Sequence, residues 1–388
     1  MKIVIFFPEG NVRNNPTLNA FVDHLEFLGI RFTIKANKNR YSFEKSQFGE
    51  AKHYSPFASR INNIVYSKIS SFIFIRIFTL ITHFKYLFFR PNLFIGIDRE
   101  GMIQAASLSS ALGIKSLGLS FEIFFEDETS TRFKSPEIEA CKHIDRFVIQ
   151  DESRGEMFSK ENLIQKEKLV FIPLGFNYSV DSNMTKIDLR SFYAIPKDKN
   201  IACVIGSLTS WSGYKKILDS LHLWPDDWVL FLHSRNSIED ELFFHKYSDL
   251  IGTRLFISEH HYLHFNELSE IVSQTDLGLA FYIATYASRY SGKNIENIGY
   301  ASGKIATYLK SGIPIIANFT NQLTSRLIVS GVGYVIKEIE DLPKRLASIE
   351  ISPEVSKKAR LFHENKLAYD NYAILMEKLL FELTNDVH

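Results

Sequence analysis

Cysteine is scarce in this chain, and the residue sets that mark disulfide-bonded or metal-bound proteins are missing. Among 388 residues only Cys141 and Cys203 occur, each within an apolar stretch. Two thiols so far apart in the sequence exclude a disulfide framework and predict free, buried side chains. His260, His261 and His264 are near neighbours, but no cysteine or carboxylate completes a ligand set at the spacing of a metal site. We therefore expect no metal and no other cofactor.

An excess of charge of one sign is also missing. The chain has 45 Lys and Arg residues and 44 Asp and Glu residues, for a formal net charge of +1. No long-range field would attract nucleic acid, and no RNA-binding or helix-turn-helix motif is present. The start of the chain lacks the charged, apolar and cleavage segments of a signal peptide. Together these absences predict a protein of the reducing cytosol.

Glycine-rich nucleotide fingerprints are missing as well. Gly10 and Gly101 stand near expected strand ends, but neither belongs to the G-x-G-x-x-G spacing of a dinucleotide site, which argues against an oxidoreductase. Asp226 and Asp227 form an acidic pair in a Trp-Pro-Asp-Asp-Trp segment. We interpret this pair as turn residues rather than as metal ligands.

The sequence does contain a regular alternation of strand and helix patterns. A buried strand at 2–7 is followed by a helix that begins at Asn15-Pro16, and then by a strand at 31–36. Because 388 residues exceed one ordinary core, this alternation predicts two α/β domains with parallel sheets. Residues 176–199 are polar and aperiodic and read as a linker, and residues from about 353 onward read as helical. Further strands are predicted at 92–97, 115–120, 146–150, 170–172, 201–205, 228–232, 255–258, 277–281, 313–317 and 334–336.

The stretch from Asn294 to Ala317 carries the clearest chemical signal. It predicts a short amphipathic helix that has Ser302 as its N-cap and Gly312 at its end, followed by a strand. A hydroxyl, the close-approach Gly303, the ammonium of Lys304 and the positive end of the helix dipole converge at the helix start, which suits an anionic phosphate. The alternative is a capped surface helix with a solvated lysine.

Several segments together resemble glycosyltransferases of the two-Rossmann-domain type (GT-B), especially those related to glycosyltransferase family 4. The resemblance covers nearly the whole chain in layout, but its motifs lie mainly in the second half. The segments that carry it are Ile172-Pro173-Leu174-Gly175-Phe176-Asn177, Gly206-Ser207-Leu208 with Gly213, Thr275-Asp276-Leu277-Gly278, and Ser302-Gly303-Lys304-Ile305 with Tyr308-Leu309 and Ser311-Gly312-Ile313-Pro314-Ile315-Ile316.

The resemblance implies two Rossmann-like domains that face each other across a cleft. The first, residues 1–175, would bind the acceptor, with a helix at about 368–388 returning to pack on it. The second, residues 176–367, would bind a nucleotide-sugar donor. The implied activity is metal-independent transfer of a sugar from a nucleotide-activated donor to a cell-surface glycan or lipid-linked saccharide, as in bacterial envelope-polysaccharide enzymes.

The chain departs from the family pattern at three positions. Glu296 matches the first of two glutamates that family 4 carries eight positions apart, but Lys304 stands where the second would be. Ser212 replaces the usual lysine before the phosphate-loop glycine, and Asp98 stands where the first domain usually has a histidine. These departures leave the choice between retaining and inverting chemistry open.

The residues expected to bind the donor lie in the second half, and those expected to act on the acceptor lie in the first. An inverting enzyme needs a base for the acceptor hydroxyl, and Glu9, Asp98 and Glu122 are three acids at expected strand ends. In a retaining enzyme they would orient acceptor hydroxyls instead, and each also has an alternative as a loop or capping residue. The expected donor-binding residues are Gly206, Ser207, Lys215, Arg235, Glu296, Ser302, Gly303 and Lys304.

Residues 61–90 are rich in phenylalanine and isoleucine, with lysine, arginine and histidine interspersed. The charges interrupt any apolar run long enough to span a bilayer, but a basic aromatic helix of this kind is typical of membrane surfaces. The alternative is a helix packed on the sheet with its charges reaching outward. A cytoplasmic protein with peripheral contact to the inner membrane surface through 61–90 follows from the first interpretation.

Two other functions fit the same layout. A sugar-nucleotide epimerase of two Rossmann-like domains would act on the sugar nucleotide alone. A non-catalytic GT-B-like partner subunit would tolerate the missing second glutamate and histidine.

Overall fold

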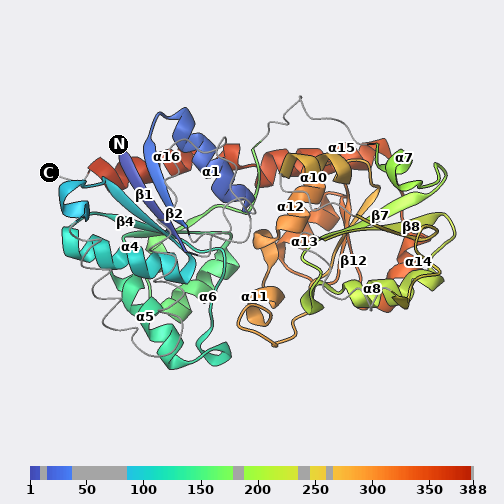
Figure 1. The fold of residues 1–388 in the computed structure, drawn as a ribbon, viewed down its shortest axis with the longest axis horizontal. Helices are drawn as coiled ribbons and strands as arrows, with labels where there is room; N and C mark the ends of the chain where they lie inside the picture. The colour runs from blue at the N-terminus through green and yellow to red at the C-terminus, as the bar shows by residue number, and fades with distance from the viewer. Residues whose placement is uncertain (9–14, 37–84, 178–187, 235–244, 259–264, 386–388) are drawn as a thin grey trace. The chain divides into compact units, whose positions relative to one another are not determined.

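The computed structural model describes residues 1–8, 15–36, 85–177, 188–234, 245–258 and 265–385, which form two compact α/β units. Unit 1 comprises Met1–Ile172 together with Tyr372–His388, and unit 2 comprises Pro173–Asn371. In each unit the described strands form a six-stranded parallel sheet, and helices cover both faces (Figure 1). The predicted fold class of two Rossmann-like α/β domains is confirmed.

The sheet of unit 1 has the order β2-β1-β3-β4-β5-β6. Because β2 lies on one side of β1 while β3 to β6 extend on the other, the chain changes direction across the sheet between β1 and β3. Ligands bind at such switch points, outside the carboxyl ends of the strands. The strands are β1 (Lys2–Phe7), β2 (Arg31–Ala36), β3 (Leu93–Ile97), β4 (Ser116–Leu119), β5 (Arg146–Ile149) and β6 (Leu169–Phe171).

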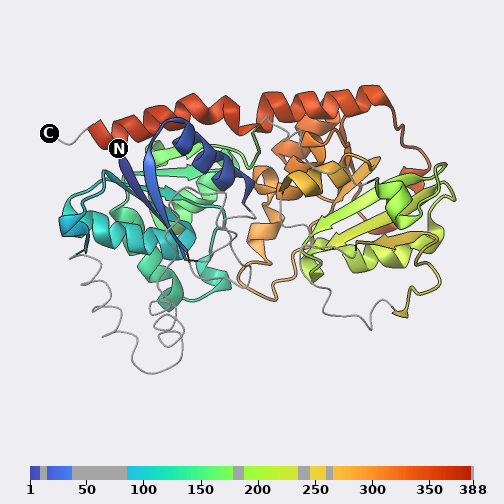
Figure 2. The ribbon, with the colours of Figure 1, turned by 45° about the horizontal axis from the view of Figure 1, so that its top comes forward.

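The helices of unit 1 come from both ends of the chain. Helix α1 (Pro16–Phe27) begins as predicted, with the Asn15 side chain accepting a hydrogen bond from the Leu18 amide and Pro16 in the first turn. Helices α4 (Asp98–Leu112), α5 (Thr131–Lys142) and α6 (Glu152–Asn162) follow in order. The C-terminal helix α16 (Ala373–Asn385) lies beside α1 (Figure 2), where His24 and Glu377 are 2.9 Å apart.

The sheet of unit 2 has the order β12-β11-β10-β7-β8-β9, so its switch point lies between β7 and β10. Strand β7 pairs with β8 along its whole length but with β10 over only two residues. The strands are β7 (Asn200–Gly206), β8 (Trp228–Ser234), β9 (Leu255–Ile257), β10 (Leu277–Ala280), β11 (Ile315–Ala317) and β12 (Gly333–Val335).

The helices of unit 2 include one that the sequence did not predict. Helix α7 (Leu189–Tyr193) lies within residues 176–199, which we expected to be a linker, and Asp188 caps it by accepting from the Arg190 and Ser191 amides. This short element is stabilised by its cap and by burial of Leu189, neither of which produces a periodic pattern. The other helices are α8 (Tyr214–Ser220), α10 (Phe265–Val272), α11 (Lys293–Glu296), α12 (Gly303–Lys310), α13 (Gln322–Val329), α14 (Leu342–Leu346) and α15 (Pro353–Phe362), the last continuing into a π-helical turn at His363–Leu367.

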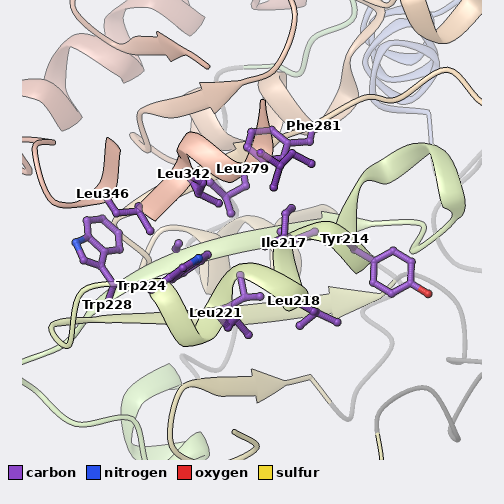
Figure 3. Close-up of a cluster of buried hydrophobic side chains, with 14 of the residues drawn as sticks. Tyr214, Ile217, Leu218, Leu221, Trp224, Trp228, Leu279, Phe281, Leu342 and Leu346 are labelled. Atoms are coloured by element: carbon purple, nitrogen blue, oxygen red, sulfur yellow. The ribbon is translucent and has the colours of Figure 1, made fainter. Parts of the chain in front are cut away.

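One core of unit 2 lies between the sheet and helices α8 and α14 (Figure 3). Leu279 and Phe281 extend from the end of β10 toward Ile217 of α8 and Leu342 of α14. Trp224 and Trp228 are also part of this cluster and are only 3% and 2% exposed. Both indoles are therefore core side chains and are too buried to contact a ligand.

Tyr308 of α12 separates β7 from β10 just past their two paired residues. Its hydroxyl accepts a hydrogen bond from the Ile205 amide at 3.1 Å and donates to the Cys203 carbonyl at 2.9 Å. Burial raises the pKa of Tyr308 well above its ordinary value, so the phenol keeps the proton that it donates. The ring packs over Gly278, where a Cβ atom would lie 2.4 Å from the Tyr308 ring. At the switch point, the Tyr308 hydroxyl thus takes the place of the backbone hydrogen bonds that would otherwise join β7 to β10.

None of the helices in the part of the chain that the structure describes is long and apolar enough to cross a membrane. Most of the basic aromatic stretch 61–90 lies outside the described residues. Its last part is described, and there Leu87, Phe88 and Phe89 are 58%, 81% and 62% exposed.

We predict that Tyr308→Phe destabilises unit 2. Removal of the hydroxyl leaves the buried Ile205 amide and Cys203 carbonyl without this partner, which costs about 1–3 kcal/mol of unfolding free energy. Urea unfolding of the variant measures the loss, with Tyr334→Phe on β12 as the matched control. Equal stability of the two variants would contradict the role assigned to the Tyr308 hydroxyl.

Candidate functional site

The carboxyl ends of β7 and β10 bring together most of the residues predicted to bind a phosphate. Gly206 ends β7 with a φ of +101°, a conformation that favours glycine. A Cβ atom at this position would lie 3.4 Å from Cε of Lys304, so the lysine stem runs directly over the glycine. Ser207, which follows, is half-buried. The end of β7 and the start of α12 are therefore in contact.

The start of α12 is built as the sequence predicted. Ser302 caps the helix, because its Oγ accepts a hydrogen bond from the Ile305 amide at 3.2 Å, and Gly303 and Lys304 form the first turn. Gly312 follows the helix with a φ of +79°. The Lys304 side chain is only 8% exposed, which contradicts the alternative of a solvated surface lysine.

Two aromatic residues that the sequence analysis did not identify also lie at this site. Trp211 follows β7 and Tyr282 follows β10, and both rings face the Lys304 ammonium. The Tyr282 hydroxyl lies 2.6 Å from Ser302 Oγ. Neither residue belongs to a periodic pattern. The only signal in the sequence is that each follows a predicted strand, and the structure shows that these two strands are neighbours.

Two further predicted donor-site residues have exposed side chains. Glu296, at the end of α11, is exposed and accepts a hydrogen bond from the Tyr286 hydroxyl at 2.6 Å. Tyr286 has a φ of +53°, which is strained for a residue with a side chain. Lys215 is exposed on α8, with its ammonium 6.0 Å from the Tyr214 ring. Arg235 lies outside the described residues.

Asp98 occupies a sharp strand-to-helix turn at the end of β3, next to the switch point of unit 1. Its φ is +51°, and its side chain is 3% exposed. One carboxylate oxygen accepts hydrogen bonds from the Phe121 and Glu122 amides at 2.6 and 3.0 Å. Gly101 lets the first turn of α4 lie close against β1, since a Cβ there would lie 2.3 Å from the Phe6 carbonyl oxygen. Asp98 therefore anchors the loop after β4 to the end of β3.

Glu122 is half-buried in that same loop. Near it lies Arg154 of α6, which is 1% exposed and donates to the Phe121 carbonyl at 2.9 Å and to Gln150 at 2.8 Å. Burial lowers the pKa of Arg154, while Glu122 is the largest of the charges that oppose this shift. The structure thus joins Asp98 and Glu122 through one network, whereas Glu9, the third predicted acid, lies outside the described residues.

Helix α12 contacts the segment in which the chain enters unit 2. At its start, Leu174 packs on Gly303, and the Leu174 amide donates to the Tyr300 carbonyl at 2.9 Å. At its end, the Lys310 ammonium lies 4.8 Å from the ring of Phe176. The segment Pro173–Phe176 is therefore fixed to both ends of the helix.

The segment that leaves unit 2 is attached at the same place. The Tyr369 amide donates to the Phe176 carbonyl at 3.0 Å, and a Cβ at Gly175 would lie 1.8 Å from the Leu367 carbonyl oxygen. His363 packs against Phe176, and burial together with the charge of Lys310 lowers its pKa to about 3. The two passages between the units are thus joined to each other and to α12.

Metal-binding clusters are not found in the part of the chain that the structure describes: no three His, Cys, Asp or Glu side chains gather as ligands. Cys141 and Cys203 are free and buried, as predicted. His260, His261 and His264 lie outside the described residues.

No protein-family model matches the sequence, and no curated protein sequence matches it. Solved structures do match over nearly the whole length. A glycosyltransferase from Rickettsia africae superposes with a TM-score of 0.69 at 13% identity, covering 99% of each chain. HepE from Anabaena, solved with UDP, has a TM-score of 0.69 at 12% identity and covers 98% of this chain and 100% of its own.

WaaG, a glycosyltransferase involved in lipopolysaccharide biosynthesis, has a TM-score of 0.61 at 12% identity, with 99% of each chain covered. HepE has also been solved with UDP-glucose. At these identities the likeness shows the fold alone. The chain therefore has the two-unit α/β fold of GT-B glycosyltransferases, as the sequence resemblance implied.

We predict that the burial of Lys310 makes the stability of the protein depend on pH. Burial lowers the pKa of Lys310 from 10.5 to about 8, partly offset by Asp370. Between these two values the unfolded chain binds a proton that the folded chain does not, so the unfolding free energy rises as the pH rises from 8 to 10.5.

Lys310→Met should remove that rise and stabilise the protein by about 1–3 kcal/mol at pH 7, where the folded protein otherwise holds a buried charge. Urea unfolding at several pH values measures both effects, with Lys357→Met on the exposed side of α15 as the control. If the unfolding free energy of Lys310→Met rose with pH as steeply as that of Lys357→Met, Lys310 would not be the source of the pH dependence.

Proposed function

We propose that this protein is a glycosyltransferase that takes a sugar from a nucleotide-activated donor. The observation that carries the proposal is the convergence, at the switch point of unit 2, of the Gly206 turn, the capped start of α12 and the buried ammonium of Lys304. Open α/β sheets bind ligands at this place, and helix starts bind phosphate. The shared fold with GT-B glycosyltransferases supports the same conclusion.

The donor diphosphate would lie against the start of α12. Cleavage of the bond between the sugar and the phosphate leaves negative charge on the leaving diphosphate. Lys304 and the dipole of α12 stabilise that charge, while Ser302, Gly303, Gly206 and Ser207 allow the backbone to approach closely. These groups act without a metal ion, because an ammonium and backbone dipoles already supply positive charge.

The donor sugar would face Glu296 and Tyr286. A carboxylate that accepts from a tyrosine hydroxyl has lone pairs left for sugar hydroxyls. The strained φ of Tyr286 is of the kind that persists at ligand sites, because the surrounding loop must hold it in place. Lys215 on α8 would contribute further positive charge, and we propose the same role for Arg235.

The acceptor would bind at the carboxyl edge of the sheet in unit 1. In an inverting enzyme Glu122 or Glu9 would take the proton of the acceptor hydroxyl, and Asp98, already committed to two amides, would hold the loop that carries Glu122. In a retaining enzyme the same acids would orient the acceptor. We propose a cell-surface glycan or a lipid-linked saccharide as the acceptor, since WaaG, of the same fold, is involved in lipopolysaccharide biosynthesis.

Peripheral contact with the cytoplasmic face of a membrane belongs to the same proposal. The basic, aromatic composition of 61–90 supports it, as does the exposure of Leu87, Phe88 and Phe89 at the described end of that stretch. A lipid-linked acceptor would be reached most directly by an enzyme held at this surface.

We predict that a nucleoside diphosphate or the corresponding nucleotide-sugar raises the melting temperature of the protein. Lys304→Ala should abolish most of this effect. Loss of one charge-assisted contact to phosphate weakens binding about 10- to 100-fold. Thermal unfolding with UDP-, GDP-, CMP- and dTDP-sugars measures the shift. Lys216→Ala, an exposed lysine on α8, is the matched control.

Absence of any shift with all of these compounds would count against the proposed function. A nucleotide-sugar that shifts the melting temperature and is converted to an isomer with no acceptor present would instead identify an epimerase. Binding without turnover on any saccharide acceptor would favour a non-catalytic subunit.

We further predict that EDTA leaves donor binding and transfer unchanged. The reason is that the positive charge at the proposed diphosphate site comes from Lys304 and α12, and the described residues contain no group of metal ligands. Transfer is measured as release of free nucleotide before and after dialysis against EDTA. Recovery of lost activity on adding Mg²⁺ or Mn²⁺ would disprove metal independence.

A further inference from the structure

Lys304 is held by two aromatic rings as well as by the helix that carries it. Its ammonium lies 5.3 Å from the centre of the Trp211 ring and 5.0 Å from that of Tyr282. The two rings are nearly parallel, with an interplanar angle of 6° and centres 6.0 Å apart. Both distances fall within the range at which a cation is attracted to the face of an aromatic ring.

Tyr282 is fixed in place by its backbone and by its side chain. The Asn318 side chain, just past β11, accepts from the Tyr282 amide at 2.8 Å and donates to its carbonyl at 2.9 Å. The hydroxyl lies 2.6 Å from Ser302 Oγ, and Phe319 packs edge-on against the ring. The ring therefore has a defined position relative to the start of α12.

Trp211 is tied to the same group of loops. Its carbonyl accepts a hydrogen bond from the Ile283 amide at 2.7 Å, so the loop after β7 and the loop after β10 are joined next to the two rings. The indole itself is half-buried. Three strand ends of the sheet, those of β7, β10 and β11, thus contribute to one rigid assembly around Lys304.

This arrangement addresses a problem that a buried lysine poses at a phosphate site. An ammonium removed from water is costly, and a flexible four-carbon stem loses rotamer freedom when it is held in one place. Attraction to the two ring faces offsets part of the cost of removing the ammonium from water. Because the rings are held in place, they also fix the position of the ammonium before any anion binds. A group positioned in advance stabilises developing charge without reorganising during the reaction.

We propose that Trp211 and Tyr282 are positioning residues that hold the Lys304 ammonium for the diphosphate of the donor, and that Trp211 reports the arrival of that diphosphate. This inference rests on the proposed function. A bound diphosphate draws the ammonium toward its oxygens, and the indole face beside it changes its electrostatic environment. The assignment concerns the diphosphate common to nucleotide-sugars rather than the base or the sugar.

The first experiment is a double-mutant cycle on Trp211 and Lys304. Trp211→Leu should weaken binding of UDP and of inorganic pyrophosphate about 3- to 10-fold, whereas Trp211→Phe, which keeps a ring, should retain most of the affinity. In a Lys304→Ala background Trp211→Leu should change affinity by less than about twofold, because the cation that the ring holds is gone. Isothermal calorimetry measures each affinity, and circular dichroism verifies that every variant is folded.

The second experiment uses the fluorescence of Trp211. The other two tryptophans, Trp224 and Trp228, are buried in the core of unit 2, so a change in emission on adding UDP should come from Trp211. This change should disappear in Trp211→Phe while calorimetry still detects UDP binding. It should also be greatly reduced in Lys304→Ala at UDP concentrations that saturate the variant.

The outcomes separate the inference from the proposed function. If UDP binds without altering Trp211 emission, and Trp211→Leu weakens binding equally with and without Lys304, the positioning role is overturned and the proposed function stands. If neither UDP nor GDP nor inorganic pyrophosphate binds the unsubstituted protein, both are overturned. Emission change together with coupling between Trp211 and Lys304 supports the inference.

Discussion

The hydroxyl of Tyr308 is the contact on which the architecture of unit 2 depends. A parallel sheet normally closes every gap between neighbouring strands with backbone hydrogen bonds, and an unpaired buried amide is costly. Here the phenol takes over that pairing between β7 and β10, and Gly278 supplies the space for its ring. The strands can then separate beyond their two paired residues while the Ile205 amide and the Cys203 carbonyl keep a partner, and Gly206 and Lys304 lie at the end of β7 beyond this point.

Helix α12 combines this structural role with the chemistry. One helix supplies the wedge between the strands, the cap at Ser302 and the buried ammonium, and it is also fixed at both ends to the segment in which the chain enters unit 2. Its position therefore depends on the sheet, on the strand-end loops and on Pro173–Phe176 at once. Two glycines make room for side chains of this helix, Gly206 for Lys304 and Gly278 for Tyr308.

The sequence predicted the features that arise within a few residues of chain. The caps at Asn15 and Ser302, the glycine after α12 and the two sets of parallel strands depend on local rules and periodicity, and all are present. The surroundings of Lys304 could not be predicted, because Trp211, Tyr282 and Asn318 come from three segments that become neighbours only when β7, β10 and β11 pair. The anchoring role of Asp98 was missed for the same reason, since its hydrogen-bond donors belong to the loop after β4.

The double passage of the chain between the units has a consequence for biosynthesis. Helix α16 is part of unit 1, where Met376, Leu379, Leu380 and Leu383 are buried and Glu377 and Glu382 bond to His24 and Arg146. A ribosome makes this helix only after every residue of unit 2. The first 172 residues therefore leave the ribosome with an apolar face still uncovered, and unit 1 reaches its final form only after unit 2 and then α16 have been synthesised. A chain that stopped before α16 would lack part of the unit that was synthesised first.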